Sequence, residues 1–85
     1  MTITPSVNLN GNDQRELLQG YLLAIHTMRA AISYTAMTAP HGRDYQTAPK
    51  GDLAAAMAEH RSRLARLESV MDELERLAEH VSDQC

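Results

Sequence analysis

The chain has 85 residues and a formal net charge of −3 at pH 7, and 44% of its residues are hydrophobic. This size allows one domain, and the composition excludes collagen-like and low-complexity chains. The negative charge argues against general binding to nucleic acids or acidic membranes. No apolar run approaches the roughly 20 residues of a membrane span, and the first twelve residues lack the apolar core of a secretory signal. The single cysteine, Cys85, favours a reducing compartment, so we expect a cytoplasmic protein.

Residues 1–11 precede the first helical pattern. Ile3, Val7 and Leu9 stand at even spacing, which is compatible with a short extended arm, and Pro5 interrupts the stretch. Chain ends that nothing ties down are poorly ordered. We therefore predict a flexible arm over residues 1–11 and a helical domain over residues 12–85.

Residues 12–39 form the first predicted helix. Asn12 or Asp13 can cap its start, because both side chains accept hydrogen bonds from the free N–H groups of a first turn. Pro40 ends it, since the residue before a proline is kept out of the helical region. At 100° per residue the apolar side chains cover about half of the circumference, and the opposite face is predicted to be polar. The seam residues predicted on this helix are Leu18, Leu22, Ile25 and Ile32.

Residues 52–82 carry the strongest pattern in the chain. Apolar residues recur at spacings of four and three over four heptads, which is typical of a helix that packs along a seam. Asp52 is the predicted cap, and the alanines that follow favour helix formation. Val70 and Leu77 add apolar surface beside the seam. The seam residues predicted here are Leu53, Met57, His60, Leu64, Leu67, Met71, Leu74 and Val81.

Two helices of similar length joined by one connection predict an all-α, antiparallel two-helix hairpin. A lone hairpin encloses no core, and both helices have more apolar surface than one neighbour covers. The simplest closure is a homodimer, in which two hairpins form a four-helix bundle with two-fold symmetry. The second helix is basic at Arg61, Arg63 and Arg66 and acidic further on, so antiparallel packing against its copy brings opposite charges together. The alternative is a solvated face of mixed charge that meets no partner.

His60 occupies a seam position among apolar residues. We interpret it as a neutral, hydrogen-bonded core residue, which can also fix the packing register as polar seam residues do in coiled coils. If it is buried, its protonation in mild acid is expected to loosen the bundle.

The connection between the helices, residues 40–51, is longer than the roughly 2–8 residues that a hairpin turn needs. Its basic side chains lie near the predicted start of the second helix, where a phosphate or carboxylate can bind. Alternatively, Tyr45 covers the hairpin end, Asp44 pairs with Arg43 and the prolines stiffen the path. The candidate contact residues of the loop and the following helix are His41, Arg43, Asp44, Tyr45, Lys50, Arg61, Arg63 and Arg66.

Catalytic and cofactor motifs are missing from the sequence. It contains no GxxxxGK[ST] phosphate loop, GxGxxG turn, GxSxG elbow or HExxH helix. The four histidines lack the spacing of metal ligands, so we expect neither a metal nor another cofactor. Cys85 has no basic neighbour beyond His80 and is a poor nucleophile. The prediction is a protein that is not an enzyme.

The stretch Pro40-His41-Gly42-Arg43-Asp44-Tyr45, followed by Ala58-Glu59-His60-Arg61 and Leu64, resembles small proteins encoded by bacteriophages and prophages. The resemblance covers about residues 38–68 and rests on a short loop and the start of a helix. It implies a helical hairpin, an intracellular bacterial or viral setting and a binding role, and it transfers no catalytic residue.

Three functions follow in order of preference. The first is a non-enzymatic protein–protein interaction module, such as a phage-type accessory or inhibitor protein that binds a host factor. The second is a small-ligand binder that holds a phosphate or nucleotide with His41, Arg43, Tyr45 and Lys50. The third is a DNA-binding accessory protein, which ranks last because the acidic half of the second helix repels phosphate.

Overall fold

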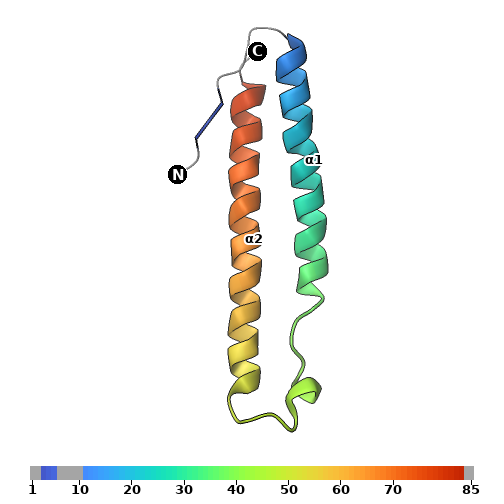
Figure 1. Ribbon diagram of the computed structural model, residues 1–85, viewed down its shortest axis with the longest axis vertical. Helices are drawn as coiled ribbons and strands as arrows, with labels where there is room; N and C mark the ends of the chain where they lie inside the picture. The colour runs from blue at the N-terminus through green and yellow to red at the C-terminus, as the bar shows by residue number, and fades with distance from the viewer. Residues whose placement is uncertain (1–2, 6–10, 84–85) are drawn as a thin grey trace.

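The computed structural model describes residues 3–5 and 11–83 and is an antiparallel pair of helices (Figure 1). Helix α1 spans Gly11–Ala36, a short 3-10 helix η1 spans Gly42–Tyr45, and α2 spans Asp52–Ser82. Over these described ranges no residue forms a strand, so the predicted all-α hairpin is confirmed. Of the predicted arm, Ile3 is exposed, whereas Val7 and Leu9 lie outside the described residues, as does Cys85.

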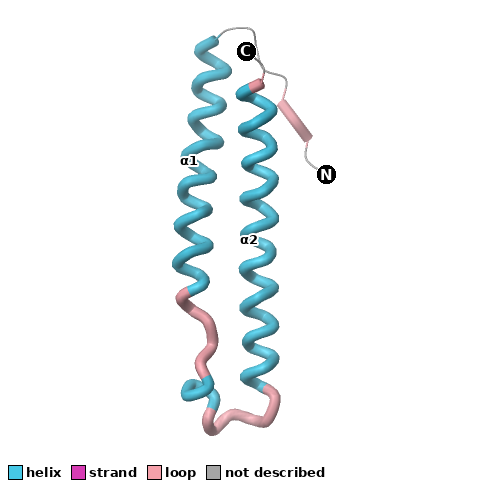
Figure 2. The backbone as a smooth tube through the Cα atoms, turned by 180° about the vertical axis from the view of Figure 1, so that it is seen from behind, coloured by secondary structure: helices cyan, strands magenta, loops and turns pink. Residues whose placement is uncertain are grey.

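Helix α1 ends at Ala36, three residues before the predicted end. The helix stops before the limit that Pro40 sets, because its last carbonyls accept hydrogen bonds from the turn that follows. Met37 N donates to Tyr34 O at 3.1 Å, and Thr38 N donates to Thr35 O at 2.9 Å. The Thr38 hydroxyl also donates to Thr35 O, at 2.6 Å. This tight turn starts the connection, which Figure 2 shows as a long loop that carries η1 below α1.

Helix α2 begins after a glycine rather than at a side-chain cap. Gly51, with φ 96° and ψ −13°, occupies the capping position, and Asp52 is the first helical residue instead of the predicted cap. Gly51 O accepts from Ala55 N at 3.0 Å, and Asp52 N donates to Pro49 O at 3.2 Å. A positive φ suits glycine because it has no Cβ. The Asp52 carboxylate lies in the first turn, where the helix dipole favours negative charge.

A hydrogen bond fixes how far the helices are offset. The side-chain amide of Gln14 donates to Val81 O at 2.9 Å, joining the first turns of α1 to the last turn of α2. Because the helices run in opposite directions, Tyr21 then lies near Leu74, and the C-terminal end of α1 lies near His60. The opposite end is closed by η1, which packs on α2.

Buried and half-buried side chains follow one side of each helix. On α1 they are Gln14, Leu17, Leu18, Tyr21, Ala24, Ile25, Met28, Ala31, Ile32 and Thr35. On α2 they include Leu53, Ala56, His60, Leu64, Leu67, Met71, Leu74, Leu77, Ala78 and Val81. The predicted seam residues Leu22 and Met57 are exposed, and Ala56 lies inward instead of Met57. A straight helix drifts about 20° per heptad from a strict seven-residue repeat, so in α2 the seam shifts from Met57 to Ala56 near the N-terminal end. Leu22 lies at the edge of the wide apolar face of α1, which α2 covers only in part.

The hairpin is one helix thick. Its extents are 61 × 22 × 12 Å, and the shortest matches the diameter of one helix with its side chains. Among the described residues only Ile25, His60, Ala78 and Val81 are buried. The radius of gyration is 18.5 Å, against about 12 Å for a compact chain of this length. A single layer has two open faces and no second layer over either of them.

Candidate interaction surface

Large apolar side chains remain exposed after the hairpin has formed. On the helices and the turn after α1, six of those that the structure describes are 41–76% exposed: Leu22, Leu23, Tyr34, Met37, Met57 and Val70. Leu23 and Tyr34 lie on the side of α1 that was predicted to be polar, and Met37 lies in the turn that follows α1. The sequence alone places Leu23 and Tyr34 on the outer face by their spacing. They were missed because that face was assigned from the polar residues between them. Exposed apolar surface of this kind is typical of an interaction site.

An apolar groove lies between the helices towards the end that carries the chain termini. Its volume is about 360 Å³, and it is lined by Glu16, Leu17, Gly20, Tyr21, Ala24 and Leu74. Gly20 opens it, because a Cβ atom at this position would have no heavy atom of a neighbour within 4 Å. Ala24, one turn further along α1, adds only a methyl group. The side of the hairpin on which these residues lie is called the groove side below. The groove could not be predicted from the sequence, since it depends on which residues of α2 stand opposite Gly20.

A second row of residues runs along α2 beside the seam. Val70 and Leu77 are one turn before and one turn after Leu74, so they extend the groove side along α2. The row continues with the same spacings of four and three residues in both directions. Its members, called the edge row below, are Glu59, Arg63, Arg66, Val70, Glu73 and Leu77. Val70 is thus an exposed apolar residue with an arginine before it and a glutamate after it.

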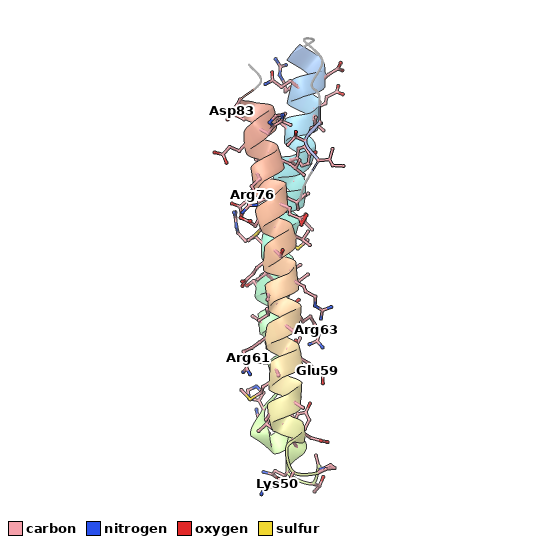
Figure 3. All side chains as sticks on the ribbon, turned by 90° about the vertical axis from the view of Figure 1, so that its left-hand side faces the viewer. Lys50, Glu59, Arg61, Arg63, Arg76 and Asp83 are labelled. Carbon is pink, nitrogen blue, oxygen red and sulfur yellow. The ribbon has the colours of Figure 1, made fainter. Side chains whose placement is uncertain are left out.

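The charged side chains of α2 do not form one basic surface. Figure 3 shows Arg63 and Glu59 on one side of the helix and Arg61 on the opposite side with Arg76. Arg66 donates from Nε to Ser62 O at 3.3 Å, within its own helix. The predicted contact residues Arg61, Arg63 and Arg66 are therefore split between the two sides of the hairpin.

Ion pairing within the hairpin is sparse. In the part of the chain that the structure describes, the ion pair is between Arg76 and Asp72, with Nη2 and Oδ2 2.8 Å apart. Both side chains are more than half exposed, so this pair contributes little to stability. Glu59 and Arg63 have the same spacing of four residues but do not form such a pair. The edge row therefore keeps charges that are open to a partner.

The loop residues show no shared binding site. His41, Arg43, Asp44 and Lys50 are exposed, and Tyr45 is half-buried. Residues 42–45 form η1, and Lys50 lies five residues beyond it, at the lower end in Figure 3. No hydrogen bond or ion pair joins these five described side chains to one another. The structure therefore brings the loop candidates to one end of the hairpin without assembling them around a ligand.

His60 is the buried polar residue of the seam, with 7% of its surface exposed. Its Nδ1 atom is buried and has no hydrogen-bond partner. The predicted core position is thus observed, but Nδ1 lacks the hydrogen bond that was expected of a core histidine. Among the described residues no group of three or more His, Cys, Asp or Glu side chains is placed to hold a metal ion.

Comparisons with family models, with curated proteins and with solved structures find no match for this chain. The resemblance to small phage-encoded proteins therefore stays a prediction. Within the described residues, neither helix combines the length and the apolar character that crossing a membrane requires.

Proposed function

We propose that this chain is a non-enzymatic protein–protein interaction module that works as a homodimer, with two hairpins forming a four-helix bundle. The observation that carries the proposal is a layer 12 Å thick that leaves leucine, methionine, tyrosine and valine side chains 41–76% exposed. Fully burying an exposed side chain of this kind contributes about 1.5–3 kcal/mol, and the part that is still exposed here supplies a share of it, so surface of this kind favours association. A second hairpin is the simplest cover, because two-fold dimers are the commonest oligomers.

A partner other than the second copy follows from the same geometry. A layer has two faces, and a two-fold dimer buries the same face of both copies. Gly20 and Leu22 point to opposite sides of α1, so the groove lies on one face of the layer and Leu22 on the other. Whichever of these two faces the dimer does not bury stays open. We propose that this open face binds a host protein in the cytoplasm, as an accessory or inhibitor protein of phage type does. The single cysteine and the resemblance of the loop support this setting.

The mass in solution tests the homodimer. Sedimentation at micromolar concentration is expected to give twice the chain mass of 9.4 kDa, in low and in high salt. High salt is expected to weaken the dimer only modestly, because its main term is apolar burial. A mass of 9.4 kDa under both conditions would overturn the proposal.

The second part of the proposal is tested by comparing two matched variants as bait for host proteins. Leu22→Glu places a charge on an exposed apolar position, and Gln19→Glu places the same charge three residues earlier on an exposed polar position. A partner that binds wild type and Gln19→Glu but is lost with Leu22→Glu, while the variant keeps its dimeric mass, supports an apolar docking face. Equal retention by all three proteins contradicts it.

A further inference from the structure

The two sides of the helical layer differ in how their charged residues are arranged. Between Leu17 and Ala31 the groove side of α1 shows Leu17, Gly20, Ala24, Thr27 and Ala31, and none of them is charged. On the opposite side, α1 presents Arg29 below Leu22, and α2 presents Arg61, Glu68 and Glu75 at intervals of seven residues. Charged groups are costly to take out of water unless each one is paired. The groove side also carries charges, at Glu16 and in the edge row of α2, but there the apolar Val70 lies between an arginine and a glutamate, so a second copy can bury Val70 while these opposite charges pair.

On this basis, and resting on the homodimer proposed above, we infer that a second copy packs on the groove side, with its α2 antiparallel to α2 of the first copy. The two-fold axis crosses the helices at Val70, and this packing is called the end-to-end arrangement. The groove between Leu17, Gly20, Ala24 and Leu74 then becomes part of the central core of the bundle. Gly20, Ala24 and Thr27 allow α1 to approach α1 of the second copy closely, because none of them carries a bulky side chain. Val70 and Leu77 supply the larger side chains of the α2 contact.

The order of charges in the edge row sets the direction of packing. Arg66 and Glu73 are seven residues apart and so lie on the same side of α2, with Val70 between them. A two-fold axis across the helices at Val70 places Arg66 of each copy opposite Glu73 of the other. Neither side chain has an ion-pair partner among the described residues of its own hairpin. Two such pairs form at once, one on each side of the axis.

The alternative two-fold axis runs along the helices and lacks this match. It packs α2 against α1 of the second copy, and the ends of the two hairpins that carry the chain termini lie at the same end of the bundle. The carboxylates of α1 are those of Asp13 and Glu16, and the Gln14–Val81 hydrogen bond places them beside the end of α2. Arg66 lies 15 residues before Val81, which is about 22 Å along the helix. Charge complementarity therefore selects the end-to-end arrangement, while the apolar contact supplies the affinity.

Cross-linking between introduced cysteines tests the axis. A residue on a two-fold axis meets its own copy, and two cysteines join when their Cα atoms are within about 7 Å. In a Cys85→Ser background, Val70→Cys is expected to give a covalent dimer under a mild oxidant. Met57→Cys is the matched control, because Met57 is 41% exposed and Val70 43%, and the two lie about 140° apart around α2. It is expected to stay uncrosslinked.

The outcomes separate this inference from the homodimer itself. If the Cys85→Ser protein has dimeric mass but Met57→Cys cross-links and Val70→Cys does not, the groove side is wrong and the homodimer stands. If that protein has monomeric mass at micromolar concentration, the homodimer is wrong as well. Dimeric mass without any cross-link at Val70 also overturns the assigned axis.

Charge exchange tests the direction of packing. Arg66→Glu and Glu73→Arg each place two like-charged pairs across the axis, and each is expected to raise the dimer dissociation constant by about tenfold. The double variant restores opposite charges and is expected to recover the wild-type constant. Failure of the double variant to recover, with the helical content of all three proteins unchanged, contradicts the end-to-end register.

Discussion

The side-chain amide of Gln14 donates a hydrogen bond of 2.9 Å to the backbone carbonyl of Val81, a residue 67 positions later in the chain. Val81 has none of its surface exposed. The carbonyls in the last turn of a helix have no donor within that helix, so a side chain from elsewhere can serve one of them. The bond thus joins the two helices at the end of the hairpin that carries the termini. It shows the axial offset of α1 against α2, and therefore which residues of the two helices face each other.

Replacing Gln14 with alanine is expected to destabilise the hairpin. The variant loses a hydrogen bond to a part-buried carbonyl, which is worth about 1 kcal/mol of unfolding free energy. Urea unfolding followed by circular dichroism measures the change. Gln19→Ala, an exposed glutamine on the same helix, is the control and is expected to change stability by less than about 0.5 kcal/mol. Equal effects of both variants would show that the bond does not hold the helix ends together.

Two valines on α2 are expected to respond differently to the same truncation. Val81 is fully buried, so Val81→Ala removes packed methyl groups and is expected to cost about 2 kcal/mol at any protein concentration. Val70 is 43% exposed in the hairpin, so Val70→Ala is expected to change the stability of the separate hairpin by less than about 1 kcal/mol.

Unfolding measured at several protein concentrations separates the two valines. The effect of Val70→Ala is expected to grow at concentrations where the protein is dimeric, because the exposed valine is buried only by the second copy. A concentration-independent loss at Val70 as large as that at Val81 would contradict the role given to Val70.

His60→Leu is expected to stabilise the protein. The buried Nδ1 atom of His60 has no hydrogen-bond partner, and an unsatisfied buried polar atom costs about 1–3 kcal/mol. Leucine fits the apolar pattern of the seam, so we expect a gain of about 1–2 kcal/mol in unfolding free energy. His26→Leu, at an exposed position, is expected to be within about 0.5 kcal/mol of wild type. A loss of stability in His60→Leu would show that the imidazole makes net favourable contacts.

Much of this architecture could be predicted from the sequence. The spacings of four and three between Leu53 and Val81 identified α2 with both ends correct. A pattern of this period that continues over four heptads fits a helix and does not fit a strand. The start of α1 was placed within one residue of Gly11. The end of α1 was predicted three residues too late. Pro40 limits how far the helix can extend, but it does not show that the Thr38 hydroxyl will donate to Thr35 O and form an earlier turn.

The groove could not be predicted, because it depends on the level of one helix against the other. Gly20 in isolation is an unfavourable residue inside a helix. It lines a groove only because Leu74 stands opposite this part of α1, at the offset that the Gln14–Val81 hydrogen bond also reflects. Leu22 lies at the edge of the wide apolar face predicted on α1 and stays exposed because α2 covers only the middle of that face. The exposure of Met57 follows from the drift of a straight helix against a strict heptad pattern.

Two glycines are expected to respond to alanine with opposite signs. Gly51 has φ 96°, where an L-residue is strained, so Gly51→Ala is expected to lower the unfolding free energy by about 1–2 kcal/mol. Gly20 lies inside α1 with space around its missing Cβ, so Gly20→Ala is expected to raise it by about 1 kcal/mol. Both are measured by urea unfolding at a concentration low enough to keep the hairpins apart. Two changes of the same sign would mean that one glycine serves a different role, and a destabilising Gly20→Ala would place a neighbouring atom where the groove now lies.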